Sequence, residues 1–76
     1  MKVSIEYCSM WNYLPRASSL EEELKSKFPG IETNLISSGG GVYEVSLDGN
    51  LIFSKKELKR FPDEREIEKL IKENSS

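Results

Sequence analysis

The sequence predicts an α/β domain of β-α-β-β-β-α order, in which a mixed four-stranded sheet carries two helices packed on one face. Three observations lead to this prediction. Four short segments place apolar or β-branched residues at alternate positions or in short runs, which is typical of strands. Two longer segments repeat apolar residues every three or four positions, as helices do. The first two strand-like segments flank a helix, which favours a parallel pair, whereas a short turn joins the last two.

The first part of the chain predicts a strand, a helix and a second strand. Residues 2–7 alternate apolar and polar side chains. From Pro15 to Phe28 the apolar positions are three or four apart, and Pro15 suits a first helical turn because its missing N–H needs no partner there. Pro29-Gly30 ends this helix. Residues 31–35 alternate again and predict the second strand.

The middle of the chain predicts a flexible connection followed by a β-hairpin. Residues 37–41 contain three successive glycines. They do not form a phosphate-binding loop, because neither a Gly-Lys-Ser/Thr sequence nor a helix follows them. Val42–Asp48 and Leu51–Ser54 predict the third and fourth strands. Asp48-Gly49 between them is a strong short-range signal for a tight hairpin turn.

The last part predicts a basic connection and a closing helix. Lys55–Phe61 includes four basic side chains in six positions. A solvated connection is favoured there over a nucleic-acid contact, because the net charge of the chain is −2. Asp63 and Glu66 form a capping-box pattern that uses Asp in place of Ser or Thr. Residues 67–71 carry the apolar stripe of the helix, and Ser75-Ser76 are expected to fray.

Length and composition exclude several classes of protein. The 76 residues suit a single domain, residues 1–76. The longest apolar run is far short of the ~20 residues of a membrane helix, and no signal-peptide pattern follows Met1, so we expect no membrane partner. The net charge of −2 argues against a nucleic-acid partner. Without histidine and with one cysteine, Cys8, the chain cannot form a His-based triad, a His-ligated metal site or an internal disulfide. We expect no metal, no cofactor, and a cytoplasmic location, where lone thiols stay reduced.

Several separated segments connect the chain with a known family. They are Glu6-Tyr7-Cys8, Asn12-Tyr13, Arg16-Ala17, Phe28-Pro29, Gly41–Val45, Leu51–Lys56 and Arg60-Phe61-Pro62. In this order and spacing they resemble the selenoprotein W family, the small Rdx (redox-like) proteins that include selenoproteins T and H. A cysteine just after the first strand of a β-α-β-β-β-α domain is also the layout of a minimal thioredoxin-like fold. The resemblance covers nearly the whole chain and implies that fold and a redox-related function.

The chain departs from this family at the redox motif. The family carries Cys-x-x-Cys or Cys-x-x-selenocysteine where the first strand ends, and the four positions here are Cys8-Ser9-Met10-Trp11. Trp11 occupies the second redox position, so no internal disulfide can form to release a mixed-disulfide partner. The resemblance therefore implies at most a monothiol oxidoreductase. In it, Cys8 would form a mixed disulfide with glutathione or a partner protein, and an outside thiol would resolve it.

The residues around Cys8 leave alternatives open. Cys8 is either a buried small hydrophobe or an exchange-capable thiol at the surface, where the nearby helix start and Arg16 would favour the thiolate. Trp11 with Met10 either packs as a hydrophobic plug or joins Tyr13 in an exposed recognition patch. Ser9 belongs to the same loop. The opposing wall of this site is expected to consist of Gly41 and Val42.

Two functions therefore remain in view. The first is a thiol protein that uses Cys8 for exchange. The second is a non-catalytic interaction module that binds through the Trp11 loop or the open face of the sheet. An intermolecular Cys8–Cys8 disulfide would be compatible with both, and the sequence does not predict the oligomeric state. Glu6 and Glu44 are expected to form an exposed pair on neighbouring strands rather than an acid–base pair.

Overall fold

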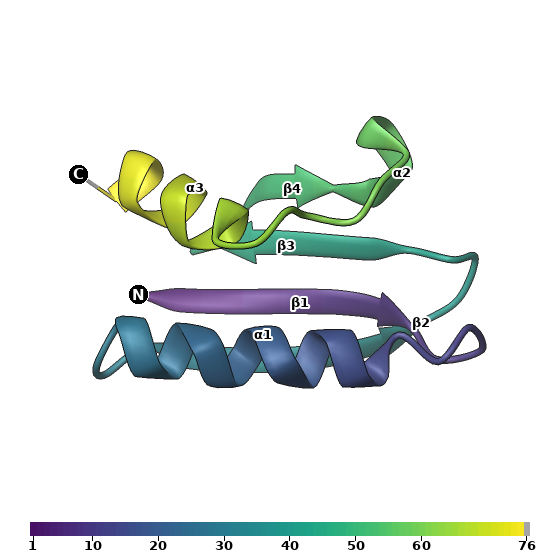
Figure 1. Ribbon diagram of the computed structural model, residues 1–76, viewed down its shortest axis with the longest axis horizontal. Helices are drawn as coiled ribbons and strands as arrows, with labels where there is room; N and C mark the ends of the chain where they lie inside the picture. Colours follow the sequence, from purple (N-terminus) through teal and green to yellow (C-terminus); the bar gives the residue numbers. More distant parts are fainter. Residues whose placement is uncertain (76) are drawn as a thin grey trace.

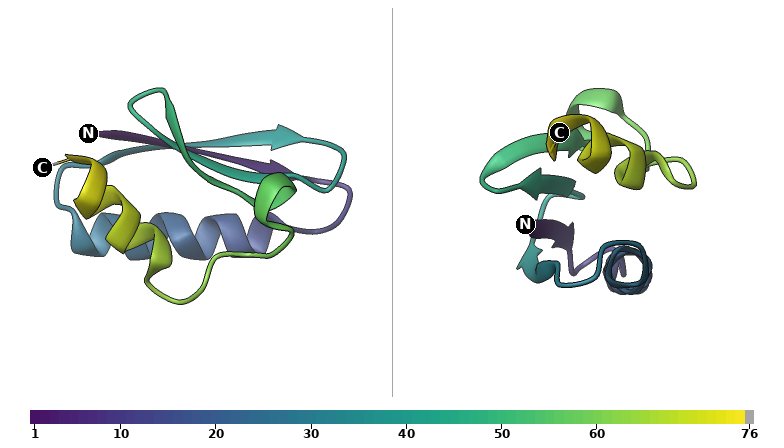
Figure 2. Two further views of the ribbon diagram at one scale, coloured as in Figure 1. Left: turned by 90° about the horizontal axis from the view of Figure 1, so that it is seen from above. Right: turned by 90° about the vertical axis from the view of Figure 1, so that its left-hand side faces the viewer.

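The computed structural model describes residues 1–75 as a sheet with helices on one face (Figure 1). The elements are β1 (Lys2–Cys8), α1 (Leu14–Lys27), β2 (Glu32–Ser38), β3 (Tyr43–Leu47), β4 (Asn50–Ser54), α2 (Lys55–Leu58) and α3 (Glu66–Ser75). Viewed from above, α1 and α3 lie on the same side of the sheet (Figure 2). The predicted order and the mixed four-stranded sheet are confirmed, and the one-turn helix α2 is an addition. No helix within residues 1–75 combines the length and the apolar character needed to cross a bilayer.

The strand order places the end of β1 next to two other chain segments. The sheet order is β2-β1-β3-β4. β2 runs parallel to β1, with Cys8 opposite Ser38, whereas β3 runs antiparallel to β1, with Tyr7 opposite Tyr43. The loop that leaves β1 and the connection from β2 to β3 therefore meet at one end of the molecule (Figure 1).

The hairpin forms as predicted, and β2 is longer than predicted. Asp48 and Gly49 have φ of 49° and 87°, the positive values that a two-residue type I′ turn requires. β2 reaches Ser38, whereas the sequence predicts a flexible loop from residue 37. The parallel pairing of β2 with β1 continues as far as Cys8, which lies opposite Ser38, and this pairing extends β2.

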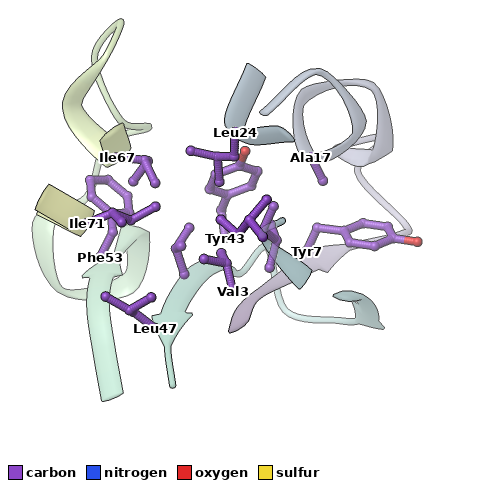
Figure 3. Packing of buried hydrophobic residues seen from close by; sticks show 12 residues of the cluster. Val3, Tyr7, Ala17, Leu24, Tyr43, Leu47, Phe53, Ile67 and Ile71 are labelled. Carbon is purple, nitrogen blue, oxygen red and sulfur yellow. The ribbon is translucent and has the colours of Figure 1, made fainter. Parts of the chain in front are cut away.

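The core lies between the sheet and the two longer helices. Ala17 and Leu24 of α1 and Ile67 and Ile71 of α3 are buried, and their side chains converge with those of the sheet (Figure 3). The sheet and the residue before β2 contribute Val3, Ile5, Tyr7, Ile31, Tyr43, Val45, Leu47 and Phe53. The alternate positions of β1 and β3 face away from this core, and these two strands are polar on that face, as the sequence predicts.

The connection after β4 is more ordered than the sequence predicts. The side-chain oxygen of Ser54 accepts a hydrogen bond from the Glu57 N–H at 3.2 Å, which caps α2, and Lys59 with φ of 59° follows its last turn. α3 begins at Glu66, and only half of the predicted capping box forms. The Glu66 carboxylate accepts a hydrogen bond from the Asp63 N–H at 2.8 Å, as in a capping box. The Glu66 N–H, however, donates its hydrogen bond to the backbone carbonyl of Asp63 and not to its side chain. α3 includes Ser75, and the predicted fraying of Ser76 lies outside the described residues.

Candidate functional site

Cys8 is the last residue of β1, and its side chain has no surface open to solvent. Its exposed fraction is 0%, and the thiol is free. The Cys8 N–H donates to the Val42 carbonyl at 2.9 Å, and the Cys8 carbonyl accepts from the Tyr13 N–H at 3.4 Å. Both connections at this end of the sheet therefore close around the cysteine. The interpretation of Cys8 as a buried small hydrophobe describes this structure, and a surface thiol does not.

The loop after Cys8 is held by hydrogen bonds near its start and at its end. The Ser9 N–H donates to the Ser38 carbonyl at 3.1 Å, and the Ser9 hydroxyl donates to the same oxygen at 3.4 Å. The bond from Tyr13 to Cys8 closes the other end, and Asn12 takes a left-handed conformation with φ of 59°. Sequence reasoning missed Ser38, because its serine- and glycine-rich surroundings indicate a flexible connection. The signal that could identify it is its pairing with Cys8, which depends on the register of β2.

Met10 and Trp11 project from this loop into solvent. Their exposed fractions are 85% and 65%, so the prediction of Trp11 as a hydrophobic plug is wrong. The position against the core is taken by Tyr13, which is half-buried and packs on the core cluster. The exposed apolar side chains of this segment are therefore Met10, Trp11 and Leu14, the last 46% exposed, and Tyr13 is not one of them.

Arg16 binds to an aromatic ring rather than folding back over the cysteine. The carbon of its guanidinium lies 4.0 Å from the centroid of the Phe61 ring, a cation–π arrangement. Its backbone carbonyl accepts a hydrogen bond from the Tyr43 hydroxyl at 3.3 Å. The sequence-based expectation that Arg16 tunes the Cys8 thiolate is therefore corrected, since its side chain is committed to Phe61.

Three aromatic rings join the base of the loop to the rest of the molecule. The Phe61 ring meets those of Tyr13 and Tyr43 edge-on, with centroid distances of 4.8 and 5.3 Å. The Lys55 ammonium lies 5.6 Å from the Tyr13 ring and 5.3 Å from the Phe61 ring. Burial raises the pKa of Tyr43 to about 12, against a smaller opposing effect of the Arg16 charge, so its hydroxyl stays protonated and donating. This cluster ties α1, α2 and the loop together.

A surface groove of about 350 Å³ lies beside this cluster, between α1 and the segment that leads into α3. The residues that line it include Arg16, Tyr43, Phe61, Asp63 and Arg65. The Tyr43 hydroxyl donates a hydrogen bond to the Arg16 carbonyl, and the Arg16 guanidinium lies on the Phe61 ring. Within the described residues, no buried side-chain nitrogen or oxygen of this lining lacks a hydrogen-bond partner. The groove therefore presents no free buried polar group that would identify a ligand.

The predicted opposing wall lies beside Cys8 through its backbone. Val42 is half-buried, and its carbonyl binds the Cys8 amide. Gly40 and Gly41 have φ of 72° and 71°, a left-handed conformation that glycine adopts without strain. The structure thus brings Cys8, Ser9, Gly41 and Val42 together, while Met10 and Trp11 point away and Arg16 lies elsewhere.

Glu6 and Glu44 lie opposite each other on β1 and β3, as expected, but both are half-buried rather than exposed. One oxygen of Glu44 accepts from the Ser54 hydroxyl at 2.7 Å, and the other accepts from the Lys56 N–H at 3.5 Å. Glu44 therefore orients the serine that caps α2, which is a structural role. Across residues 1–75, no three Cys, His, Asp or Glu side chains are grouped so that they could hold a metal ion.

The fold and the site define a thioredoxin-like α/β domain with one buried cysteine at the end of β1 and an exposed tryptophan three positions later. Comparison with known proteins gives the family. The model of the Rdx family matches residues 2–73, and the chain belongs to this family. Membership in this family connects the chain with redox-related proteins at that general level.

The relatives agree with this assignment. The chain is 30% identical over 76 residues to migration and invasion enhancer 1 of Bos taurus, a match covering 100% of the chain and 66% of that protein. It therefore spans just under two thirds of this relative. It is 28% identical over 72 residues to human selenoprotein V, covering 91% of the chain and 21% of that protein. The crystal structure of a selenoprotein W-related protein from Vibrio cholerae superposes with a TM-score of 0.92 at 25% identity, covering 99% of this chain and 96% of that one.

Proposed function

We propose that this chain is a non-catalytic interaction module that keeps the Rdx scaffold and binds a partner protein through Met10 and Trp11. The contrast in exposure supports this proposal: Cys8 has an exposed fraction of 0%, whereas Trp11 has 65%. A nucleophilic thiol must reach its target, and this one is covered. Tryptophan is enriched among the residues that dominate binding energy at protein interfaces.

The loop is also prepared for binding. Backbone hydrogen bonds hold it near both ends, through Ser9 and Tyr13. Binding orders little additional chain when the loop is already fixed, which lowers the entropic cost of association. Met10 adds an adaptable apolar side chain beside the rigid ring of Trp11, and both sit where the family carries its redox motif. The proposed site therefore consists of two exposed apolar side chains, Met10 and Trp11, on a loop that backbone hydrogen bonds hold in place.

Monothiol exchange by Cys8 is the second candidate, supported by family membership and by the place of Cys8 at the end of β1. In this reaction the Cys8 thiolate attacks one sulfur of oxidised glutathione. A new S–S bond forms, the glutathione disulfide breaks, and one glutathione thiolate leaves. A second thiol then attacks the mixed disulfide and releases Cys8. The loop or the 39–42 connection must first open. For either function we propose a cytoplasmic location, where the thiol stays reduced.

Thiol reactivity separates the two candidates. The wild-type chain is treated with an alkylating reagent, and in parallel with oxidised glutathione, in native buffer and in urea, and the products are measured by mass spectrometry. We expect Cys8 to react at least about 100-fold more slowly in the native state, which corresponds to an opening free energy of about 2.8 kcal/mol. We also expect no glutathione adduct in native buffer. Equal reaction rates in both conditions, with a glutathione adduct, would establish monothiol exchange instead.

Partner capture tests the binding role directly. Immobilised wild-type chain and Cys8→Ala should retain the same protein partner to the same extent. A Met10→Ser/Trp11→Ser variant should lose it while remaining folded by circular dichroism, because both side chains are exposed. Loss of capture in Cys8→Ala, with the double variant unaffected, would refute the proposed function.

A further inference from the structure

The end of the molecule that carries the proposed binding loop has an uncharged tip. The loop after β1, residues 9–13, and the connection from β2 to β3, residues 39–42, contain no charged side chain, although 32% of the chain is charged. Both segments lie at this end in Figure 1 and in the view from above in Figure 2. Met10 and Trp11 are the large apolar side chains of this tip, and both are exposed.

Basic side chains of α2 lie behind this tip. The Lys55 ammonium is 5.6 Å from the Tyr13 ring, so α2 reaches the base of the loop. Lys56 and Lys59 are exposed, and neither ammonium forms an ion pair within residues 1–75. Arg60, by contrast, is engaged by the Glu66 carboxylate at 2.7 and 2.9 Å. Lys56 and Lys59 are therefore two exposed cations next to Lys55 that are free of ion pairs in the described part of the chain.

The charge of the molecule is unevenly distributed. Residues 55–60 contain four basic side chains and one acidic side chain, a net charge of +3, although the whole chain has a net charge of −2. Opposite charges across an interface accelerate encounter and select the partner, and like charges oppose it. A partner that contacts this end is therefore favoured if it is acidic, and it needs an apolar group to cover Met10 and Trp11.

We propose that this end binds an acidic segment of a partner protein, in which one apolar side chain packs on Met10 and Trp11 while carboxylates pair with Lys56 and Lys59. The proposal rests on the proposed function and specifies its partner. The pairs are solvent-exposed, so they contribute modestly to affinity and more strongly to selectivity.

The charge distribution favours a protein segment over an anionic membrane. A bilayer meets this end as an extended plane, and its field also acts on Glu57 and on the remaining acidic side chains of a chain whose net charge is −2. The charges of a peptide segment interact mainly with the side chains that the segment covers. The segment can pair with Lys56 and Lys59 without covering the acidic side chains of α1.

Trp11 is the only tryptophan, so its fluorescence reports on this site alone. The probes are a synthetic glutamate-rich peptide with a central leucine, its glutamine-for-glutamate counterpart, and vesicles of phosphatidylserine and phosphatidylcholine. We expect the acidic peptide to shift Trp11 emission to shorter wavelength in a saturable manner, and to bind about 3- to 10-fold more weakly to a Lys56→Gln/Lys59→Gln variant. Raising the salt concentration should reduce this difference.

The matched control is Lys25→Gln/Lys27→Gln, which makes the same change in net charge at the far end of α1. It should leave peptide affinity unchanged. Equal binding of the acidic and glutamine peptides, or equal loss in both lysine variants, would overturn the acidic-segment proposal while leaving Trp11-mediated binding intact. A response to the vesicles but not to the peptide would assign the surface to membranes instead. If no probe shifts the emission, the acidic-segment proposal fails, and the capture experiment decides the proposed function separately.

Discussion

Replacement of Phe61 by leucine tests whether aromatic contacts hold the loop end of the molecule together. The Phe61 ring meets Tyr13 and Tyr43 edge-on at 4.8 and 5.3 Å, and the guanidinium of Arg16 lies 4.0 Å from its centroid. Each aromatic pair contributes about 0.5–1.5 kcal/mol, and an exposed cation–π contact about 0.5–1 kcal/mol. Leucine keeps much of the apolar area but none of these contacts. The sum is about 1.5–4 kcal/mol, and we expect about 2 kcal/mol because such contributions are not additive among neighbours.

The effect should be visible in thermal unfolding. The unfolding entropy per residue is about 2.1 cal/mol/K, which gives about 0.16 kcal/mol/K for this chain, so a loss of 2 kcal/mol lowers Tm by about 12 °C. Circular dichroism during heating and in a urea series gives both quantities. The matched control is Phe28→Leu, since Phe28 is also half-buried against the core but no ring or cation contact to it is seen within residues 1–75. We expect about 1 kcal/mol or less there. Equal destabilisation of the two variants would show that the aromatic and cation–π contacts of Phe61 add no stability beyond its apolar packing.

Three further substitutions follow from the structure. Cys8→Ser should destabilise the chain by about 1–3 kcal/mol, more than Cys8→Ala, because it adds a hydroxyl at a fully buried position; urea unfolding measures the difference. Gly49→Ala should cost about 1–2 kcal/mol in the same assay, because Gly49 has φ of 87°. The Arg60 guanidinium lowers the pKa of Glu66 to about 2 through hydrogen bonds. This pair therefore stabilises the fold above about pH 4.5 and progressively less as pH falls towards 2, and Glu66→Gln should flatten that dependence in unfolding experiments.

Each of these expectations has an outcome that contradicts it. A Cys8→Ser variant as stable as Cys8→Ala would show that the buried position accommodates a hydroxyl. An unchanged stability of Gly49→Ala would argue against the type I′ turn. If Glu66→Gln and wild type lose stability in parallel from pH 5 to pH 2, another carboxylate is responsible for the acid sensitivity. The comparison at Cys8 also guides the functional tests, because Cys8→Ala is the expected choice for removing the thiol without unfolding the chain.

Some features of the site could be predicted from the sequence, and others could not. The family resemblance identified Cys8 as the candidate site residue. The absence of a second cysteine was evident from the sequence itself. The placement of Trp11 did not follow, because a tryptophan in a loop has the same local pattern whether it packs inward or outward. Tyr13, two residues later, occupies the inward position by meeting Phe61 at 4.8 Å, a partner far away in sequence. The one-turn helix α2 was also missed, because its cap depends on a hydrogen bond from Ser54 to Glu44 on the neighbouring strand.

The amino-acid sequence alone was sufficient to predict the order of the strands and the two longer helices, the Asp48-Gly49 turn, the core stripes of α1 and α3, and the impossibility of a dithiol cycle. These properties depend on residue type and on spacing over a few positions, which local physics translates directly into structure. The burial of Cys8 and the exposure of Met10 and Trp11 became known only from the three-dimensional packing. The packing also decided that Arg16 lies on Phe61 and that the lysines of α2 lie behind the loop. Those outcomes depend on which distant segments meet at the end of β1, and the register of β2 and β3 sets that meeting.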